Sequence, residues 1–262
     1  MFCLTPHQID FMETFGYLKF PGLLKDKLSA IEHAFQSLME KNGGDKHAGL
    51  KRFDVSPFIN HDFYLCTLLD DSRIQGIASG LLGENYQYWN SDGNYYVGDT
   101  YWHSDTDWPE PIRFYKMAIY LDKMTQDTGA LRIIPGSHRF GEGFSETVHK
   151  HLTSENSMWG KLKGQEIPAV AVETEPGDLV VFNHSTKHSA WGGGRKRRMF
   201  TIVFTGYHEK GPSRDAFREI IKQHGYTTHE VFGDEDQPLL SAEKHERLRH
   251  LKNLLENIPK TT

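Results

Sequence analysis

From Tyr86 onward the chain consists of short segments rich in Tyr, Val, Ile and Phe, most of them separated by Gly, Asp, Asn or Pro. Segments of this length and composition, bounded by turn residues, are typical of β-strands. The expected strands are 86–90, 95–98, 112–121, 130–134, 167–173, 178–182 and 199–206. No regular repeat of about 33–45 residues is present, which argues against a solenoid or a propeller. The pattern therefore predicts an all-β sandwich or barrel.

Helical patterns precede and follow this β-rich part. Thr5 and Gln8 have the spacing of a capping box, Pro6 suits the first helical position, and Gly16 offers a stop. Capping residues of this kind predict a helix between residues 6 and 15. Further helices are expected over 23–42, 62–82, 213–224 and 241–257.

No linker divides the chain, so residues 1–262 are expected to form a single domain. It would have a helical N-terminal part to about residue 83, a β core over about 86–206 and a helical C-terminal part over about 207–262. A long polar segment at 139–166 contains Gly141 and Gly143. An insertion of this length in a compact β domain is often a lid.

Composition excludes several classes of function. A net charge of −5 and a pI near 6.3 argue against a general nucleic-acid binder. Cys3 and Cys66 do not make a disulfide framework, which fits a reduced compartment. No apolar run reaches membrane-spanning length, and the first residues lack the pattern of a signal peptide. We therefore expect a cytoplasmic protein that binds neither nucleic acid nor membranes.

The residues most suited to metal chemistry are His103, Asp105 and His188. His103 and Asp105 are two positions apart in a β context, so their side chains are expected on one face. His188 follows shortly after an expected strand, and His184 competes with it as the third ligand. Two imidazoles and one carboxylate suit a non-haem Fe(II) with open coordination positions. Zinc accepts the same ligands, so the residues alone leave both metals open.

Arg197 and Arg198 stand nine and ten positions after His188. An Arg fork matches a carboxylate with two parallel hydrogen bonds, so either residue could hold the far carboxylate of an α-keto acid co-substrate. Strand alternation separates the two arginines. One face of the strand carries Phe200, Ile202 and Phe204, and the other carries Met199, Thr201 and Val203. Arg197 shares the smaller, more mixed face expected inside a barrel, so we expect Arg197 rather than Arg198 to bind the co-substrate.

Four segments occur along the chain in a recognisable order. They are 4–24, the Tyr101-Trp102-His103-Ser104-Asp105 run, the glycine-rich 129–138, and 177–188. Together they resemble the phytanoyl-CoA dioxygenase family of Fe(II)/2-oxoglutarate oxygenases, and locally its ectoine hydroxylase branch. The resemblance implies a mainly β fold, a double-stranded β-helix (jelly roll, cupin-like), with N- and C-terminal α-helices packed outside it.

The resemblance also implies a reaction. His103, Asp105 and His188 match the family's iron ligands, with 2-oxoglutarate as co-substrate and O2 as oxidant. The implied function is hydroxylation of a small-molecule metabolite with release of succinate and CO2. Related halogenases have Gly or Ala at the position of Asp105, so its carboxylate favours hydroxylation, while desaturation and ring closure stay open. A zinc-dependent hydrolase and a non-catalytic jelly-roll binding module are the alternatives.

Further co-substrate contacts are carried over by resemblance. Asn90 is similar to an Asn that contacts 2-oxoglutarate in ectoine hydroxylases, and Trp108 is similar to a pocket tryptophan of that branch. The family often has His-Gly-Ser at the second histidine, whereas here Ser189 follows His188 directly and could supply the hydroxyl. Many relatives also carry a Trp where this chain has Ala118.

Overall fold

The computed structural model describes residues 2–106, 112–153, 166–167, 169–194, 197–206 and 212–224. Within these residues the strands form two antiparallel sheets. The larger sheet has the order β1 (Tyr17–Phe20), β8 (Leu179–Asn183), β5 (Phe114–Tyr120), β10 (Arg197–Gly206), β3 (Tyr86–Tyr96) and β2 (Phe53–Val55). The smaller sheet has the order β4 (Thr100–His103), β9 (His188–Ala190), β6 (Leu131–Ile133) and β7 (Val170–Val172).

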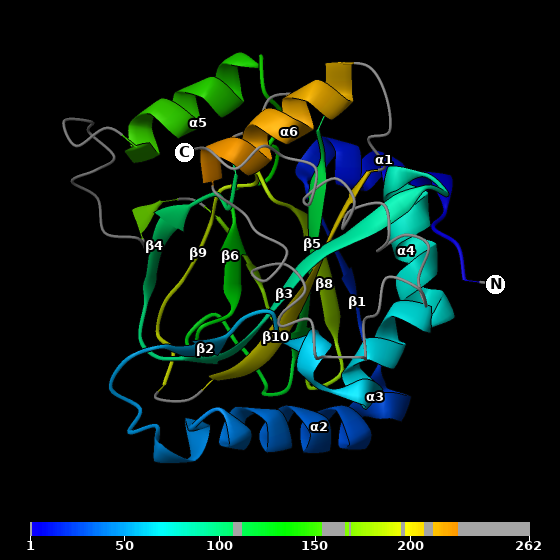
Figure 1. Ribbon diagram of the computed structural model, residues 1–262. Coiled ribbons are helices and arrows are strands. Elements are labelled where there is room, and N and C mark those ends of the chain that lie inside the picture. Colours follow the sequence, from blue (N-terminus) through cyan, green and yellow to red (C-terminus); the bar gives the residue numbers. More distant parts are fainter. Residues whose placement is uncertain are drawn as a thin grey trace.

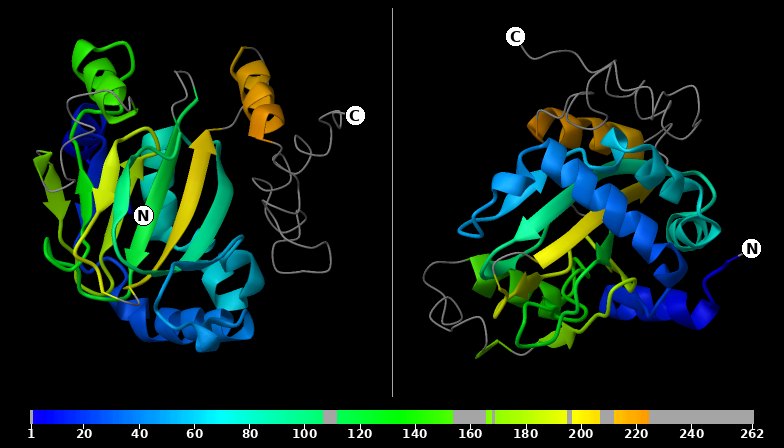
Figure 2. Two further views of the ribbon diagram at one scale, coloured as in Figure 1. Left: turned by 90° about the vertical axis from the view of Figure 1, so that its left-hand side faces the viewer. Right: turned by 90° about the horizontal axis from the view of Figure 1, so that it is seen from below.

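The two sheets face one another, as Figure 2 shows. Apolar side chains from both sheets form a layer between them. Ala118, Val180 and Phe182 of the larger sheet contribute to this layer, together with Leu131 and Ile133 of the smaller one. Two facing antiparallel sheets of this order form a jelly roll, so the predicted mainly β fold is confirmed.

Helices cover the outside of the larger sheet and both ends of the molecule (Figure 1). They are α1 (Pro6–Phe15), α2 (Leu28–Lys41), α3 (Phe63–Cys66), α4 (Ser72–Leu82), α5 (Gly143–Thr153) and α6 (Pro212–His224). Short 3₁₀ helices lie at Lys25–Lys27, Gly44–Lys46, Ile59–His61 and Thr67–Asp70. In Figure 1, α2 runs beneath the sheets, whereas α5 and α6 lie at the opposite end.

The start of the first helix agrees with the prediction. The Thr5 hydroxyl accepts a hydrogen bond from the Gln8 amide at 3.2 Å, and the Gln8 side chain accepts one from the Thr5 amide at 2.9 Å. Gly16 ends the helix in the left-handed conformation, with φ of 84°. A capping box and a glycine stop are local devices, which is why the sequence alone located this helix.

The predicted helix over 62–82 is wrong in its continuity. The segment contains α3, a 3₁₀ turn and α4, because Asp71 adopts an extended conformation with φ −66° and ψ 123°. The Asp71 side chain accepts a hydrogen bond from the Arg73 amide at 2.9 Å and so begins a new helix. The predicted helix over 23–42 is shorter than expected, since α2 begins at Leu28.

The predicted break between the strands 86–90 and 95–98 is also wrong, because β3 runs without interruption from Tyr86 to Tyr96. The sequence Asp92-Gly93-Asn94 has the composition of a turn. Gly93 instead provides room, since a Cβ there would lie 2.2 Å from the Phe58 ring. The glycine therefore permits a close approach within a strand.

The alternation predicted for β10 is confirmed. Phe200, Ile202 and Phe204 are buried against the helices on the outer face of the larger sheet. Arg197 and Met199 lie on the opposite face, toward the smaller sheet. Short strands such as β1, β2 and β9 were not predicted, because three or four residues give too little periodicity to identify a strand.

Two further predictions concern peripheral segments. The segment 139–166 contains α5, while residues 154–165 lie outside the described residues, so a lid remains a prediction. The helix expected at 213–224 is present as α6, and the one at 241–257 lies outside the described residues.

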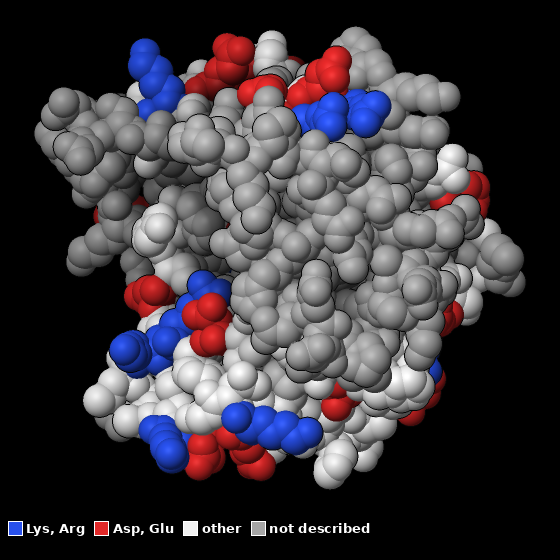
Figure 3. Space-filling view, viewed as in Figure 1, with Lys and Arg blue, Asp and Glu red and all other residues white. Residues whose placement is uncertain are grey.

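Figure 3 shows basic and acidic side chains side by side along the edges of the described surface, without a continuous patch of one sign on that face. No helix in the described part of the chain is long and apolar enough to cross a membrane.

Candidate metal and co-substrate site

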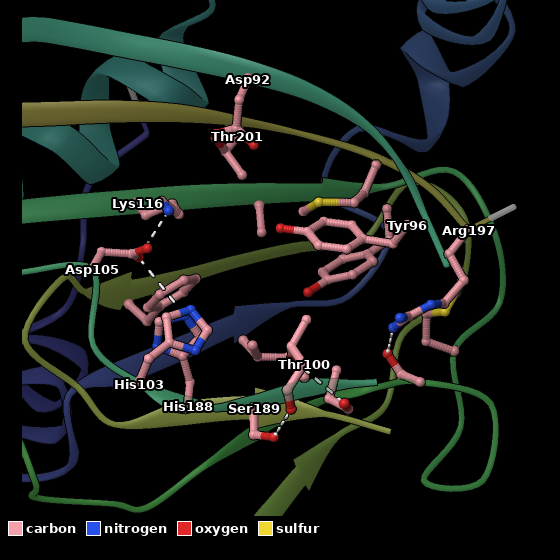
Figure 4. A pocket seen from close by; sticks show the side chains of 18 of the residues that line it. Asp92, Tyr96, Thr100, His103, Asp105, Lys116, His188, Ser189, Arg197 and Thr201 are labelled. Atoms are coloured by element: carbon pink, nitrogen blue, oxygen red, sulfur yellow. Dashed lines mark hydrogen bonds and ion pairs between the residues drawn. The ribbon is translucent and has the colours of Figure 1, made fainter. Parts of the chain in front are cut away.

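His103, Asp105 and His188 lie together at one end of the space between the sheets (Figure 4). One ligand atom from each lies within 4.8 Å of the other two. His103 ends β4 and His188 begins β9, and the two are direct partners in the antiparallel register. Their ring centroids are therefore only 4.3 Å apart. The Asp105 amide donates to the His184 carbonyl at 2.9 Å, which fixes the loop that carries the carboxylate.

Both histidines of this group are oriented by backbone carbonyls. His103 Nδ1 lies 2.8 Å from the Tyr101 carbonyl oxygen, and His188 Nδ1 lies 2.9 Å from that of Thr186. A carbonyl can only accept, so each Nδ1 carries a hydrogen, and Nε2 is the ring nitrogen available to a metal ion. His188 Nε2 lies 3.8 Å from Asp105 Oδ2. Metal-binding histidines are held in the same way in known sites.

The protonation states also suit a cation. Burial raises the pKa of the Asp105 carboxyl, but Lys116 and the histidines His184 and His188 outweigh burial and hold this pKa well below its usual range. Burial lowers the pKa of His188 to about 4. At neutral pH the site therefore offers a carboxylate and a neutral imidazole, and these are the forms that bind metal.

His184, the competing third ligand, lies beside this group. Its Nε2 is 4.0 Å from Asp105 Oδ2, but its ring stacks on Phe114, with centroids 5.6 Å apart. The group of potential metal ligands among the described residues contains His188 and not His184. Burial lowers the pKa of His184 to about 3, so this side chain is also neutral at physiological pH.

A cavity of about 170 Å³ lies between the sheets, next to the three candidate ligands. Figure 4 shows these ligands at one end of the cavity and Arg197 at the other, with Tyr96 between them. Thr201 and Ser189 also line the cavity, from the larger and the smaller sheet respectively. The arrangement can therefore accept a molecule that reaches from a metal ion to a guanidinium.

Arg197 is buried, with 8% of its surface exposed. Its Nη1 donates to the Gly129 carbonyl at 2.8 Å and its Nη2 donates to the Gly98 carbonyl, while Nε has no hydrogen-bond partner among the described residues. The guanidinium carbon lies 5.5 Å from the centre of the Tyr96 ring. A buried cation held by neutral carbonyls retains its charge to attract an anion.

Two glycines make room for this guanidinium. A Cβ on Gly129 would lie 2.4 Å from Arg197 Nη1, and a Cβ on Gly193 would lie 2.3 Å from Arg197 Nε. The glycine-rich segments at 129–138 and 192–194 thus shape the site as well as the turns. A sequence pattern of glycines is compatible with either role, so their packing against Arg197 was not predicted.

Arg198 faces away from the cavity. Its guanidinium forms ion pairs with Asp122 at 2.7 Å and with Glu32 of α2 at 3.1 Å. The structure therefore separates the two adjacent arginines as strand alternation predicted, with Arg197 toward the cavity and Arg198 toward α2.

The other predicted co-substrate residues have different positions. Ser189 lines the cavity, and its hydroxyl donates to the Thr100 carbonyl at 2.6 Å. Asn90 is not among the residues that line the cavity, and its amide nitrogen lies 3.4 Å from the Ser56 hydroxyl. Trp108 lies outside the described residues.

Lys116 is the site residue whose contact sequence reasoning missed. Its Nζ lies 2.8 Å from Asp105 Oδ2. The available signal was a single charged residue within Phe114–Tyr120, a segment that is otherwise apolar or aromatic. The sequence does not identify the partner of this charge, because Asp105 lies eleven residues earlier, in the loop that follows another strand.

Comparisons with known proteins bear on this site. The sequence profile of the phytanoyl-CoA dioxygenase (PhyH) family matches residues 12–199. An ectoine dioxygenase of Sphingopyxis alaskensis is 29% identical over 154 residues, which cover 49% of this chain and 48% of that protein. The match thus spans about half the length of this curated relative.

Several solved structures share the fold. The carbocyclase SnoK from nogalamycin biosynthesis, described as non-haem and α-ketoglutarate-dependent, has a TM-score of 0.61 and 21% identity, covering 78% of this chain and 84% of that one. EctD from S. alaskensis with 2-oxoglutarate and 5-hydroxyectoine has a TM-score of 0.59 and 21% identity, covering 78% and 76%. HygX from Streptomyces hygroscopicus with iron has a TM-score of 0.60 and 15% identity, covering 78% and 87%. At these identities the likeness concerns the fold.

Proposed function

The chain belongs to the phytanoyl-CoA dioxygenase family, and we propose that it is an Fe(II)- and 2-oxoglutarate-dependent dioxygenase that hydroxylates a small-molecule metabolite with release of succinate and CO2. The observation that carries this proposal is one cavity with the His103, Asp105 and His188 group at one end and the buried Arg197 at the other. A metal ion and a dicarboxylic keto acid need these two features together.

His103, Asp105 and His188 would hold Fe(II), through the Nε2 atoms of the two histidines and an oxygen of the carboxylate. Two imidazoles and a single carboxylate are the donor set of non-haem iron oxygenases. The bound iron would supply the activation of O2, for which the protein has no side chain of its own. The carbonyls of Tyr101 and Thr186 hold the rings in the required orientation.

Arg197 would bind the far carboxylate of 2-oxoglutarate. Arg197 lines the cavity, and its Nε has no hydrogen-bond partner among the described residues. Burial raises the pKa of the Tyr120 phenol and also that of the Tyr96 phenol. Both phenols are therefore neutral and can donate hydrogen bonds to an anion. Ser189 lines the same cavity and is proposed as a further contact of 2-oxoglutarate. Asn90 does not line the cavity, so the structure gives no support for a contact between Asn90 and 2-oxoglutarate.

The apolar layer between the sheets would limit the access of water to the reacting atoms. The ring centroids of Phe182 and His188 lie 5.0 Å apart. Met199 and Leu131 also line the cavity. A site of this kind protects reactive species from side reactions. The relative named ectoine dioxygenase acts, by its name, on a small molecule, which supports a small-molecule substrate here.

The test measures whether the protein converts 2-oxoglutarate to succinate, and with which metal ion. Protein prepared without metal is loaded with Fe(II) or Zn(II), supplied with 2-oxoglutarate and air, and assayed for succinate. We expect slow succinate release with Fe(II) only, faster in the presence of the substrate, which a panel of metabolites would identify. Absence of succinate under all conditions would contradict the proposal, and hydrolytic activity with Zn(II) would support the zinc hydrolase instead.

A further inference from the structure

The candidate ligand Asp105 lies beyond the end of the strand that precedes it. β4 ends at His103, and the pairing of His103 with His188 is the last one between β4 and β9. Asp105 therefore lies outside the ladder of backbone hydrogen bonds that holds the two histidines side by side. Its amide donates to the His184 carbonyl at 2.9 Å, and this contact fixes the backbone nitrogen. Metal binding also requires that the carboxylate be held in a fixed place relative to both histidines.

A hydrogen bond between two side chains extends the pairing of these segments by one position. Lys187 Nζ donates to Ser104 Oγ at 2.6 Å. Lys187 directly precedes His188 in the sequence, and Ser104 lies between the other two candidate ligands. Lys187 and Ser104 are the residues that would face one another if the antiparallel register continued past the two histidines. The bond thus joins the two segments that carry the candidate ligands.

Strand alternation places this bond on the side of the smaller sheet that faces away from the candidate metal site. Successive side chains of a strand point to opposite faces. His188 lines the cavity between the sheets, whereas Lys187 lines a second, smaller cavity of about 110 Å³. Ser145 and His149 of α5 also line this second cavity. Lys187 can therefore hold the ligand-bearing segments without occupying the space that 2-oxoglutarate needs.

The lysine itself is firmly placed. Only 3% of Lys187 is exposed. Its amide donates to Ser137 Oγ at 2.8 Å, and its carbonyl accepts from the Ile134 amide at 3.0 Å. A hydrogen bond from an ammonium group is stronger than one between neutral groups, and burial of the lysine limits competition from water. Such a bond can fix the position of a segment that has left its strand.

We propose that Lys187 is a positioning residue that, through Ser104, holds Asp105 within reach of the metal ion that the two histidines bind. This inference rests on the proposed function, because it requires that the three candidate ligands bind a metal. Lys187 also carries a positive charge, which by itself disfavours a nearby metal cation. The two effects have opposite signs: loss of the charge alone would tighten metal binding, whereas loss of the positioning weakens it.

The experiment titrates Mn(II), which does not oxidise in air as Fe(II) does, into the metal-free natural protein and two variants. Lys187→Met removes the donor, and Ser104→Ala removes the acceptor and keeps the charge. We expect both variants to bind Mn(II) about 10- to 100-fold more weakly, the range known for residues that orient metal ligands. The double variant should bind no more weakly than the weaker single variant, because both substitutions remove one interaction. The electron paramagnetic resonance spectrum of the bound Mn(II) should change as well, since it depends on the arrangement of the ligands.

Two further variants serve as controls. Tyr88→Phe removes another buried hydrogen bond of 2.6 Å, from Tyr88 to Asn60 on the helix-covered side of the larger sheet. It should lower the stability of the metal-free protein in urea and leave the Mn(II) affinity unchanged. Lys187→Arg keeps the charge and the donors, and it should recover part of the affinity that Lys187→Met loses. If Lys187→Met does not fold, Lys187→Gln replaces it under the same expectation.

The outcomes separate the two proposals. Failure of the natural protein to bind Mn(II) would overturn the proposed metal site itself. Binding by the natural protein, with unchanged or tighter binding in either Lys187→Met or Ser104→Ala, would overturn only the role of Lys187. An equal loss of affinity in Tyr88→Phe would also overturn that role, because it would show that any loss of stability weakens the site.

Discussion

Arg197 Nη1 donates a hydrogen bond to the Gly129 carbonyl at 2.8 Å, and the guanidinium fits there only because Gly129 has no side chain. Gly129 lies just before β6 of the smaller sheet, whereas Arg197 begins β10 of the larger one. The contact therefore joins the two sheets at the end of the cavity opposite the candidate metal ligands. It positions a buried cation with neutral acceptors and leaves the charge available for a ligand.

Replacing the two adjacent arginines should have different effects. Arg197→Ala should raise the KM for 2-oxoglutarate about 10- to 100-fold, since a hydrogen bond to a charged group contributes about 1.5–3 kcal/mol. Arg198→Ala removes partly exposed ion pairs and should cost at most about 1 kcal/mol of stability, with little change in KM. Steady-state kinetics of both variants measures the KM for 2-oxoglutarate, and urea unfolding measures their stability. A larger KM effect in Arg198→Ala would mean that the co-substrate binds elsewhere.

Gly129→Ala should impair the same site without removing the arginine. Gly129 has φ of 95°, and a Cβ would lie 2.4 Å from Arg197 Nη1. We expect a rise in the KM for 2-oxoglutarate and a loss of about 1–3 kcal/mol in the free energy of unfolding. Gly83→Ala is the matched control, because φ is 83° there but nothing lies within 4 Å of the added Cβ. Equal KM values in both variants would show that the space at Gly129 does not matter for the co-substrate.

The candidate metal ligands can be tested one at a time. His103→Ala, Asp105→Ala and His188→Ala should each abolish or strongly weaken Mn(II) binding, because each removes a donor of the group. His184→Ala should keep Mn(II) binding, since its ring stacks on Phe114 and lies outside that group. Calorimetric titration of the four variants decides between His184 and His188. Loss of binding in His184→Ala together with binding in His188→Ala would reverse our assignment of the third ligand.

The stability of the metal-free protein should depend on pH through its buried histidines. Burial lowers the pKa of His184 to about 3, compared with an ordinary value of 6.5. Between these values the unfolded chain binds a proton that the folded protein does not, so stability is complete above pH 6.5 and falls as pH falls toward 3. Urea unfolding at pH 7.5, 6 and 5, with a chelator present, should show this decline. The decline should be less steep in His184→Gln, and an identical slope in both proteins would exclude a contribution from His184.

Several features of the fold and the site could be predicted from the sequence because they are local. The capping box of Thr5 and Gln8 needs only one turn of chain. The division of β10 into a face of Phe200, Ile202 and Phe204 and a face containing Arg197 follows from the two-residue period of a strand. The His-x-Asp spacing of residues 103 and 105 identified two members of the candidate metal group in the same way.

The tertiary structure decided what depends on distant segments meeting. The register of β4 with β9 places His188, rather than His184, beside His103. The sequence Asp92-Gly93-Asn94 has the composition of a turn but lies within β3, because Phe58 packs against Gly93 from another part of the chain. The pairing of Lys116 with Asp105 likewise depends on how the two sheets face each other. Propensity and periodicity act over a few residues, whereas these contacts form only when sheet packing brings separate strands together.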